Sequence, residues 1–282
     1  MIASLRPAFP RLSVHRMCAL LGVPRSLVYR RSRSPDWRTS LLKEVEEIVT
    51  TWLGYGYRRV HRELRRRGFT LGEHRVRRVM REEGLWSRSS HRPQGVTRRR
   101  KGDAVFPNLV KGRAPESINE IWVADMTRIR TDSGPCYLAS LIDLHSRKVV
   151  AWSVSRRPNT ELALACLEAA LEKRRPDAGW IHHSDQGSTY TARDYVSRVL
   201  LSKGRMSMSR AGCPIENAFA ESFFRTLKSE EVHLNSYASY LELEASLSRY
   251  IDGSYNTTRM HSALGYRSPD EFEASPKEGP TN

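Results

Sequence analysis

The sequence predicts an α/β domain with a mixed sheet, preceded by an all-helical region that contains a helix-turn-helix. Three observations support this fold class. Residues 1–115 hold the basic charge and show only helical spacing of apolar residues. From residue 118, three strand-like runs follow one another, and strands then alternate with helices. Three consecutive strands pair as an antiparallel meander, and the later β-α-β crossovers add parallel strands.

The 282 residues carry a net charge of +16, which is unevenly distributed. Residues 1–115 contain 27 Lys and Arg against 9 Asp and Glu, whereas residues 116–282 contain 20 against 22. Basic helical faces that serve only solubility usually carry both signs. An excess this one-sided indicates a polyanionic partner, most often nucleic acid.

Other bulk features predict a cytoplasmic protein without a membrane partner. No run of about 18 apolar residues predicts a transmembrane helix. The N-terminus lacks the apolar stretch and the cleavage pattern of a signal peptide. The four cysteines are isolated, with no C-x-x-C pair, which is typical of reduced thiols rather than of disulfides or a zinc site.

The chain begins with a short helix-turn-helix-like segment, predicted over residues 1–36. Ser13 is expected to cap a helix that ends at Leu21, and Gly22 is expected to turn the chain. A second helix follows Pro24. A pair of helices joined by a glycine-containing turn is a pattern of DNA-reading proteins, although short helical hairpins also occur without DNA contact.

Residues 37–86 form the main predicted DNA-binding domain, a further helix-turn-helix. Its runs "LLKEVEEIVTTW", "YGYRRVHRELRRRG" and "LGEHRVRRVMREEGLW" have apolar residues at helical spacing, and arginines fill the last two. A single arginine of this kind is usually solvated, but the set favours phosphate contact. The expected DNA-binding residues are Arg58, Arg65, Arg66, Arg67, Arg75, Arg77 and Arg78. Residues 87–117, rich in Arg, Ser, Gly and Pro, are a basic linker.

The α/β domain is expected over residues 118–275, with a tail at 276–282. Its first strands are "EIWVADMTRIRT", "PCYLASLIDL" and "RKVVAWSVS". The helix "NTELALACLEAALEKRR" follows, with Asn159 or Thr160 as its cap. A strand "GWIHHS", a helix "TARDYVSRVLLSKG", a strand "RMSMSR" and a long helix that begins near Glu216 complete the order.

Three acids occupy positions in this domain that suggest a shared site. Asp125 lies in the middle of the first strand, Asp185 ends the fourth strand, and Glu221 lies inside the last helix. An isolated buried carboxylate is costly unless it is paired or binds a metal. If the three acids converge at one sheet edge, they form a hard-oxygen site for Mg²⁺ or Mn²⁺. Helical spacing also places Arg225 and Lys228 on the side that carries Glu221.

Each acid has an alternative or a competitor. Asp185 is also placed to cap the helix suggested by "TARDYVSRVLL". Asp143, before the "HSR" turn, suggests an Asx turn more than a metal ligand. Glu216 competes with Glu221 for the third position, but its place at the helix start suits capping and interaction with the helix dipole.

Two histidines precede Asp185. Strand alternation places His183 on the face of Asp185 and His182 on the opposite face. A zinc site requires further His or Cys ligands at suitable spacing, which the sequence lacks. Both histidines are therefore expected to be structural or to support the acids.

The motifs around the acids resemble a known family. In chain order they are W-x-x-D-M-T, H-S-D-Q-G-S-x-Y, S-M-S-R-x-G, E-N-A-F-A-E-S-F-F-R-T-L-K-S-E and Y-N-T-T-R-M-H-S-A-L-G-Y-R-S-P. Together they closely resemble the OrfB-type DDE transposases of the insertion sequence 3 family, over residues 118–275. Residues 40–86 resemble the helix-turn-helix that precedes the core in that family. The chain departs from it at Glu216, where members often have Asp.

The resemblance implies an RNase H-like fold with a retroviral-integrase-like catalytic core. Its Asp-Asp-(35)-Glu triad falls on Asp125, Asp185 and Glu221, which would bind two Mg²⁺ or Mn²⁺ ions. The implied activity is metal-dependent DNA strand cleavage and strand transfer, by which an insertion sequence transposes. The residues expected to position DNA beside the triad, or to brace the core, are Arg225, Lys228, Asn256, Arg259 and His261.

The implied partners are the terminal repeats of the element and the target DNA. Transposition holds two ends together, so a homo-oligomer on DNA is expected. The resemblance also suggests a product of an upstream reading frame, of the OrfA type, as a partner or fusion. The implied location is the nucleoid-associated cytoplasm of a bacterium.

Two other functions stay open at this point. A helix-turn-helix regulator with an α/β effector domain explains the basic half but not three acids in core elements. A nuclease that only hydrolyses DNA would share the fold and the metal ions. Metal-dependent nicking separates the first from a transposase, and an assay with a pre-cut 3′-OH end separates the second.

Overall fold

The computed structural model describes residues 12–24, 36–85, 105–210 and 218–275. The chain divides into two compact units, residues 1–50 and 51–282, and each is described by itself. Outside the described residues lie the expected helix after Pro24, most of the basic linker and the tail.

The first unit contains the short N-terminal helix α2 (Val14–Leu20). The helix begins as expected, because the Oγ of Ser13 accepts a hydrogen bond from the Arg16 amide at 3.3 Å. Gly22 follows it with a φ of +62°, a left-handed conformation that glycine adopts without steric cost. The predicted cap and turn are both confirmed.

Three helices follow within residues 36–85: α4 (Asp36–Thr51), α5 (Tyr57–Arg66) and α6 (Glu73–Glu82). Each has a buried stripe of apolar residues at helical spacing, as the sequence predicts. The buried residues are Leu41, Val45, Ile48, Val60, Leu64, Val76, Val79 and Met80. Gly68, with a φ of +87°, ends α5 at the predicted position.

The second unit contains a five-stranded sheet with the strand order β3-β2-β1-β4-β5. Its strands are β1 (Ile121–Thr131), β2 (Gly134–Asp143), β3 (Val149–Ser155), β4 (Ile181–Ser184) and β5 (Arg205–Met208). Strands β1, β2 and β3 form an antiparallel meander, and β4 pairs in parallel with both β1 and β5. This topology confirms the predicted mixed, RNase H-like sheet.

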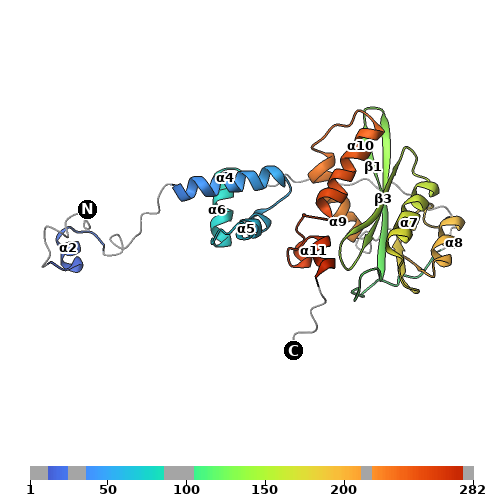
Figure 1. The fold of residues 1–282 in the computed structure, drawn as a ribbon, viewed down its shortest axis with the longest axis horizontal. Coiled ribbons are helices and arrows are strands. Elements are labelled where there is room, and N and C mark those ends of the chain that lie inside the picture. Colours follow the sequence, from blue (N-terminus) through green and yellow to red (C-terminus); the bar gives the residue numbers. More distant parts are fainter. Residues whose placement is uncertain (1–11, 25–35, 86–104, 211–217, 276–282) are drawn as a thin grey trace. The chain divides into compact units, whose positions relative to one another are not determined.

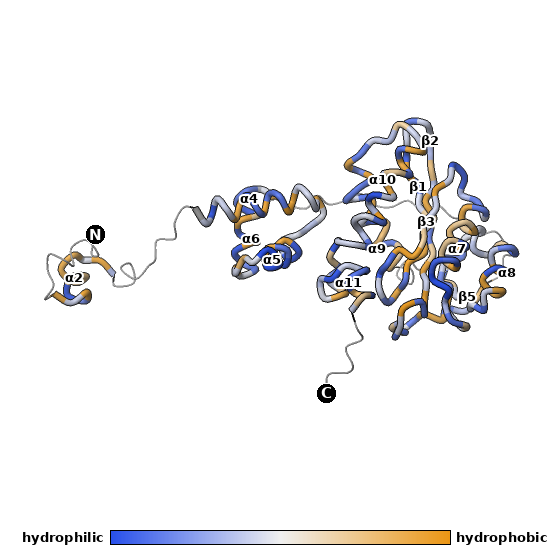
Figure 2. Tube along the Cα trace, viewed as in Figure 1, coloured by the Kyte–Doolittle hydropathy of each residue, from blue (hydrophilic) through white to orange (hydrophobic). Residues whose placement is uncertain are grey.

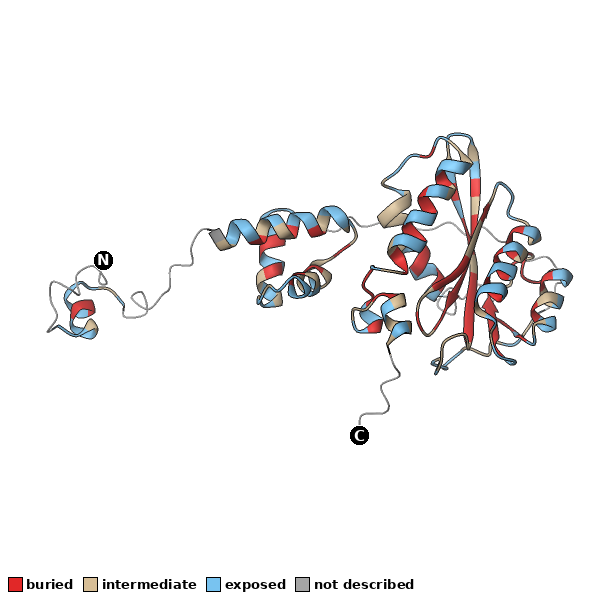
Figure 3. Ribbon diagram, in the orientation of Figure 1, coloured by how far each residue is buried: buried red, intermediate tan, exposed pale blue. Residues whose placement is uncertain are grey.

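Helices cover both faces of the sheet (Figure 1). Helices α7 (Thr160–Arg174) and α8 (Arg193–Leu201) pack on one face, and α9 (Ala218–Leu227) and α10 (Tyr240–Tyr250) pack on the other. The strands are buried over most of their length (Figure 3), and much of the sheet is hydrophobic (Figure 2). Alternate residues of β1 therefore enter two cores. Ile121, Val123 and Ile129 face α9, whereas Trp122, Ala124 and Met126 face α7.

The C-terminal part contains the predicted long helix and, after it, helices that the sequence patterns did not predict. Helix α9 continues as a π-helical turn, η2 (Lys228–Val232), and α10 continues as η3 (Ile251–Tyr255). A 3₁₀ turn, η4 (Ser262–Leu264), and α11 (Pro269–Ala274) follow. Ser268 and Glu271 form a capping box at the start of α11, which is a sequence signal for this helix. No helix among the described residues is long and apolar enough to cross a membrane.

A buried ion pair joins η2 to the segment after η3. The guanidinium of Arg259 donates two hydrogen bonds to the carboxylate of Glu230, both at 2.7 Å. Their side chains are only 4% and 8% exposed. The hydroxyl of Tyr250 donates a third hydrogen bond to Glu230, at 2.8 Å. Removing one partner would leave the other charge buried without compensation.

We therefore expect Arg259→Ala to lower the free energy of unfolding by about 3–5 kcal/mol, the usual effect of breaking a buried pair. Urea denaturation of the purified protein measures this change. Arg198→Ala is the matched control, because the pair between Arg198 and Glu168 is 33% and 50% exposed. Exposed pairs contribute only about 0–1 kcal/mol. Equal losses in the two variants would contradict a stabilising role of burial in the Arg259 pair.

Candidate active site

Asp125 lies in the middle of β1, on the face that α9 covers. Strand alternation places it with Val123 and Ile129, which belong to the core on that side. Ser140, its partner across the antiparallel ladder, is buried. Asp125 itself is half-buried, and its Oδ1 accepts a hydrogen bond from the Met126 amide at 2.7 Å. A carboxylate thus stands between the apolar residues Ala124 and Met126 of a largely buried strand.

Asp185 directly follows β4, the strand next to β1. The two strands run parallel, and Val123 pairs with His183. Asp125 and Asp185 each lie two residues beyond this pair, so alternation brings both to the same level on the same face. The Oδ1 of Asp185 accepts a hydrogen bond from the Gly187 amide at 2.9 Å, which fixes the turn after the strand.

Helix α9 carries the third acid over this face. Its buried side chains are Ala220, Phe223, Phe224 and Leu227, which share a core with β1. Glu221 and Arg225 are exposed on the helix. Lys228, at the start of η2, is half-buried.

Electrostatic interactions link four of these residues. Burial, and then the negative charge of Asp185, raise the pKa of Asp125 from its ordinary 3.8 to about 7. Glu221 also contributes to this rise, and the Met126 amide and Lys228 oppose it; the value of about 7 includes all of these effects. Burial lowers the pKa of Lys228, and the Asp125 charge opposes that shift. Binding a proton or a cation at Asp125 therefore lowers the free energy of the folded protein.

The donor set suits a hard divalent cation. Carboxylate oxygens are the ligands that Mg²⁺ and Mn²⁺ prefer. Three further polar atoms nearby in the chain or sheet are buried and lack a hydrogen-bond partner among the described residues: Ser140 Oγ, Gln186 Oε1 and the Tyr190 hydroxyl. Among all the residues that the structure describes, however, no three His, Cys, Asp or Glu side chains lie close enough together to hold a metal ion. The three acids therefore fit the cation in the chemistry and charge of their side chains, although the structure does not gather them into a closed metal site.

Tyr190 is a residue of this region to which the sequence patterns assigned no role. Its side chain is buried, with 1% exposed. Burial raises the pKa of its hydroxyl well above the usual value, and the charges of Asp125 and Asp185 contribute. Its position at the end of the motif H-S-D-Q-G-S-x-Y was the available signal.

The two histidines before Asp185 are buried and each contacts a hydroxyl side chain of the domain, so the expectation that they are structural or support the acids stays open between its two alternatives. The Nε2 of His182 lies 2.8 Å from the Tyr195 hydroxyl, and the Nδ1 of His183 lies 2.8 Å from Ser207 Oγ. Burial lowers the pKa of His182 to about 3, so this imidazole is neutral at physiological pH.

The alternatives for the acids have different outcomes. Helix α8 has Ala192 as its N-cap, so the hypothesis that Asp185 caps this helix is wrong. Asp143 makes the expected Asx turn, because its Oδ1 accepts the amides of His145 and Ser146 at 2.8 and 2.9 Å. Glu216 lies outside the described residues.

Three of the residues expected to position DNA or brace the core make contacts within the domain. The Asn256 side-chain amide exchanges two hydrogen bonds with the backbone of Val149, at 2.9 and 3.0 Å. Arg259 pairs with Glu230. His261 is 9% exposed, and burial lowers its pKa to about 3. These contacts are those of core-bracing residues, and contact with DNA stays a prediction for all three.

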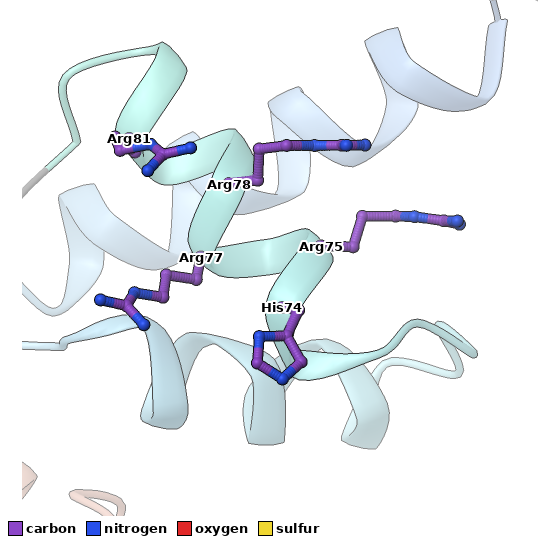
Figure 4. A pocket seen from close by; sticks show the side chains of 5 residues that line it. All are labelled: His74, Arg75, Arg77, Arg78 and Arg81. Carbon is purple, nitrogen blue, oxygen red and sulfur yellow. The ribbon is translucent and has the colours of Figure 1, made fainter.

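The arginines of α5 and α6 lie mostly on exposed helix surfaces. Arg75 and Arg78 extend to one side of α6 and Arg77 to the other (Figure 4). A surface hollow is lined by His74, Arg75, Arg77, Arg78 and Arg81. Some arginines have acidic neighbours: the pairs are Arg58–Glu73, Arg66–Glu271, Arg67–Glu63 and Arg78–Glu82, at 3.1–3.8 Å. Arg65 is exposed. The basic surface predicted from the sequence is thus partly neutralised within the chain.

Comparisons with known proteins identify relatives over most of the chain. Residues 115–214 and 203–269 match families described as integrase core domains, and residues 36–93 match an HTH-like domain. The transposase for insertion sequence element IS904 of Lactococcus lactis is 39% identical, over 86% of this chain and 97% of its own length. Transposase InsF for insertion sequence IS3A of Escherichia coli is 35% identical, over 93% and 94%. Among solved structures, a chain of the simian T-cell lymphotropic virus intasome in complex with the PP2A regulatory subunit B56 gamma has a TM-score of 0.48 and 15% identity, covering 84% of this chain and 76% of its own.

The raised pKa of Asp125 predicts how the metal-free protein responds to pH. Between the ordinary pKa of 3.8 and the folded-state value of about 7, the folded protein binds the proton more tightly than the unfolded chain does. The stability contributed by this proton is therefore lost as the pH rises through about 7. Asp125→Asn should gain stability relative to wild type between about pH 4 and pH 8, measured by thermal denaturation with EDTA present. Added Mg²⁺ should stabilise wild type at the upper end of this range more than the variant. A stability difference that does not change with pH would contradict the assignment.

Proposed function

The chain belongs to the insertion sequence 3 family of transposases, and on this premise we propose that it cleaves and joins DNA strands with Asp125, Asp185 and Glu221. The family match supports a polynucleotidyl transferase that acts in DNA transposition. The assignment of the triad and its use of metal ions are our proposal.

One observation carries the proposal: the negative charges of Asp185 and Glu221 both act on the carboxyl of Asp125. These acids come from a strand, the end of the adjacent strand and a helix, and nothing in their local structure requires them to face one another. Like charges placed together raise the free energy of the folded protein, unless a proton or a cation compensates them. A cation bound by all three acids would compensate their negative charges.

The three carboxylates would hold Mg²⁺ or Mn²⁺. When bound, two such ions stabilise the attacking and leaving oxygens of an in-line phosphoryl displacement as Lewis acids. The Asp125 side chain, central on β1, would face both other acids. The ammonium of Lys228 acts on Asp125 and is half-buried, so it is placed to bind a DNA phosphate beside the acids.

The proposed chemistry has two steps, each of which makes one P–O bond and breaks one. In the first, a water oxygen bonds to phosphorus at an element end, and the bond to the 3′ oxygen breaks to leave a free 3′-OH. In the second, that 3′ oxygen bonds to phosphorus in another phosphodiester, at the other element end or in target DNA. Each step replaces one phosphodiester oxygen by another, so no nucleotide cofactor is consumed.

The N-terminal half would supply DNA binding. The arginines of α5 and α6 would contact the phosphates of the terminal repeats and align an element end with the acids. Because two ends react together, the active form would be a homo-oligomer on DNA, alone or with an OrfA-type product. A regulator without catalytic activity is disfavoured, since it would leave the charge convergence at Asp125 without a role.

Replacing any triad carboxylate by its amide tests the proposal. Asp125→Asn, Asp185→Asn and Glu221→Gln should each reduce cleavage and joining by more than the roughly 100-fold that is typical of mutations around metal ligands. The assay uses labelled duplexes of the terminal repeat, uncut or pre-cut to a 3′-OH, with Mg²⁺. DNA binding by mobility shift should be retained. Wild-type joining by any one variant would remove that residue from the triad, and hydrolysis without joining in the wild type would favour a nuclease.

Replacing Arg65, Arg66 and Arg67 together by Gln tests the DNA-binding surface. If they contact phosphates, the slope of log affinity against log salt should decrease by about 0.9 for each phosphate that is no longer neutralised. Fluorescence anisotropy over a range of salt concentrations measures this slope. Arg198→Gln on α8 is the control, because it removes one positive charge far along the chain from the basic segment. An unchanged slope in the triple variant would place these arginines off the DNA.

A further inference from the structure

The turn between β2 and β3 touches the beginning of the helix that carries Glu221. The guanidinium carbon of Arg147, in this turn, lies 4.0 Å from the ring centroid of Phe219. Phe219 is in the first turn of α9, two residues before Glu221. A guanidinium stacked this closely on an aromatic ring makes a favourable cation–π contact.

The turn that presents Arg147 is firmly held. Asp143, at the end of β2, is fully buried, and its carboxylate accepts amide hydrogen bonds from Asn119, His145 and Ser146. The Arg147 amide donates to the Asp143 carbonyl at 2.9 Å. The guanidinium therefore projects from a fixed backbone.

Arg147 has two energetically unfavourable features, which indicates that another interaction compensates them. Its φ is +62°, a left-handed conformation that non-glycine residues seldom adopt. Its Nη1 is buried and has no hydrogen-bond partner among the described residues. Burial also lowers the pKa of this guanidinium, against the opposing effects of Tyr255 and Asp143. The stacking on Phe219 is the contact that accompanies both features.

Helix geometry connects this contact to Glu221. Successive residues are turned by about 100° around the helix axis. Ala220, fully buried, faces the sheet, so Phe219 and Glu221 lie on opposite flanks of α9. In the strand order, β2 and β3 lie on one side of β1, and β4, which leads to Asp185, lies on the other. Arg147 contacts one flank of the helix, and Glu221 projects from the other.

We propose that Arg147 is a positioning residue: by holding Phe219 it sets the rotation of α9 about its axis, and with it the approach of Glu221 to Asp125. This inference rests on the proposed function, in which Glu221 is a metal ligand. Without the contact the first turn of α9 would rotate or fray, whereas the later turns stay fixed by Phe223, Phe224 and Leu227. The rate would then fall, and more Mg²⁺ would be needed to recruit Glu221.

The test uses Arg147→Asn and Phe219→Leu in the full chain. Asn tolerates the left-handed backbone, so the turn should keep its fold without the guanidinium. Joining of a pre-cut terminal repeat should slow by about 10- to 100-fold, as expected for a small displacement of a catalytic group. The Mg²⁺ concentration for half-maximal rate should rise, while the thermal midpoint and DNA affinity stay at wild-type values. The double variant should be no slower than the slower single variant, because both remove the same contact.

Two controls separate positioning from folding. Phe219→Tyr keeps the aromatic ring and should keep the wild-type rate. Arg198→Gln removes an exposed guanidinium from α8, which packs on the opposite face of the sheet from α9, and should leave joining unchanged. Wild-type rate and Mg²⁺ dependence in both test variants, with Glu221→Gln inactive, would overturn this inference and leave the proposed function intact. A rate loss matched by a fall in the thermal midpoint, with unchanged Mg²⁺ dependence, would also overturn it. Activity in Glu221→Gln would instead refute the proposed function.

Discussion

The arrangement of the integrase-like domain depends on placing Asp125 and Asp185 level on one face of a buried sheet, with Glu221 on the helix that covers this face. Burial, the charge of Asp185 and the charge of Glu221 together raise the pKa of Asp125 to about 7. Such a site is stable only within a rigid framework whose other interactions hold it in place. The framework here is the five-stranded sheet, buried on both faces, in which parallel pairing of β1 and β4 brings Asp125 and Asp185 level.

Two apolar cores, one on each face of the sheet, hold the elements of this site in place. On the face opposite Asp125, the residues of β1 that alternate with it pack against α7. The core on the α9 side holds the helix that carries Glu221 and Lys228 against the same strand. Position along β1 therefore decides role: Val123 and Ile129 anchor the helix, and Asp125 between them faces it.

The sequence predicted those elements whose signal is local. Strand alternation, the cap at Asn159 and the stop at Gly68 are all encoded within a few residues, and all occur as expected. The triad was proposed because three acids lie in elements that favour burial, and because the motifs around them resemble a family. Helix α10 was missed because a polar residue, Ser246, stands on its buried face, and α11 because six residues are too few to show a helical period. The pairing of Arg259 with Glu230 depends on tertiary contact between distant segments, which no local pattern encodes.

The acids that this domain removes from water fall into two groups, and the difference separates structure from function. Glu230 is neutralised by two hydrogen bonds from Arg259, and Asp143 accepts three backbone amides. Both carboxylates are compensated by the chain itself. Asp125 accepts a hydrogen bond from Met126 and is opposed by two acids, with Lys228 as a partial counter-charge. The chain compensates Glu230 and Asp143 fully but Asp125 only partly, which supports our proposal that a cation from solution binds at Asp125. That contrast, more than the acids' number or spacing, is the physical reason to place the chemistry at Asp125.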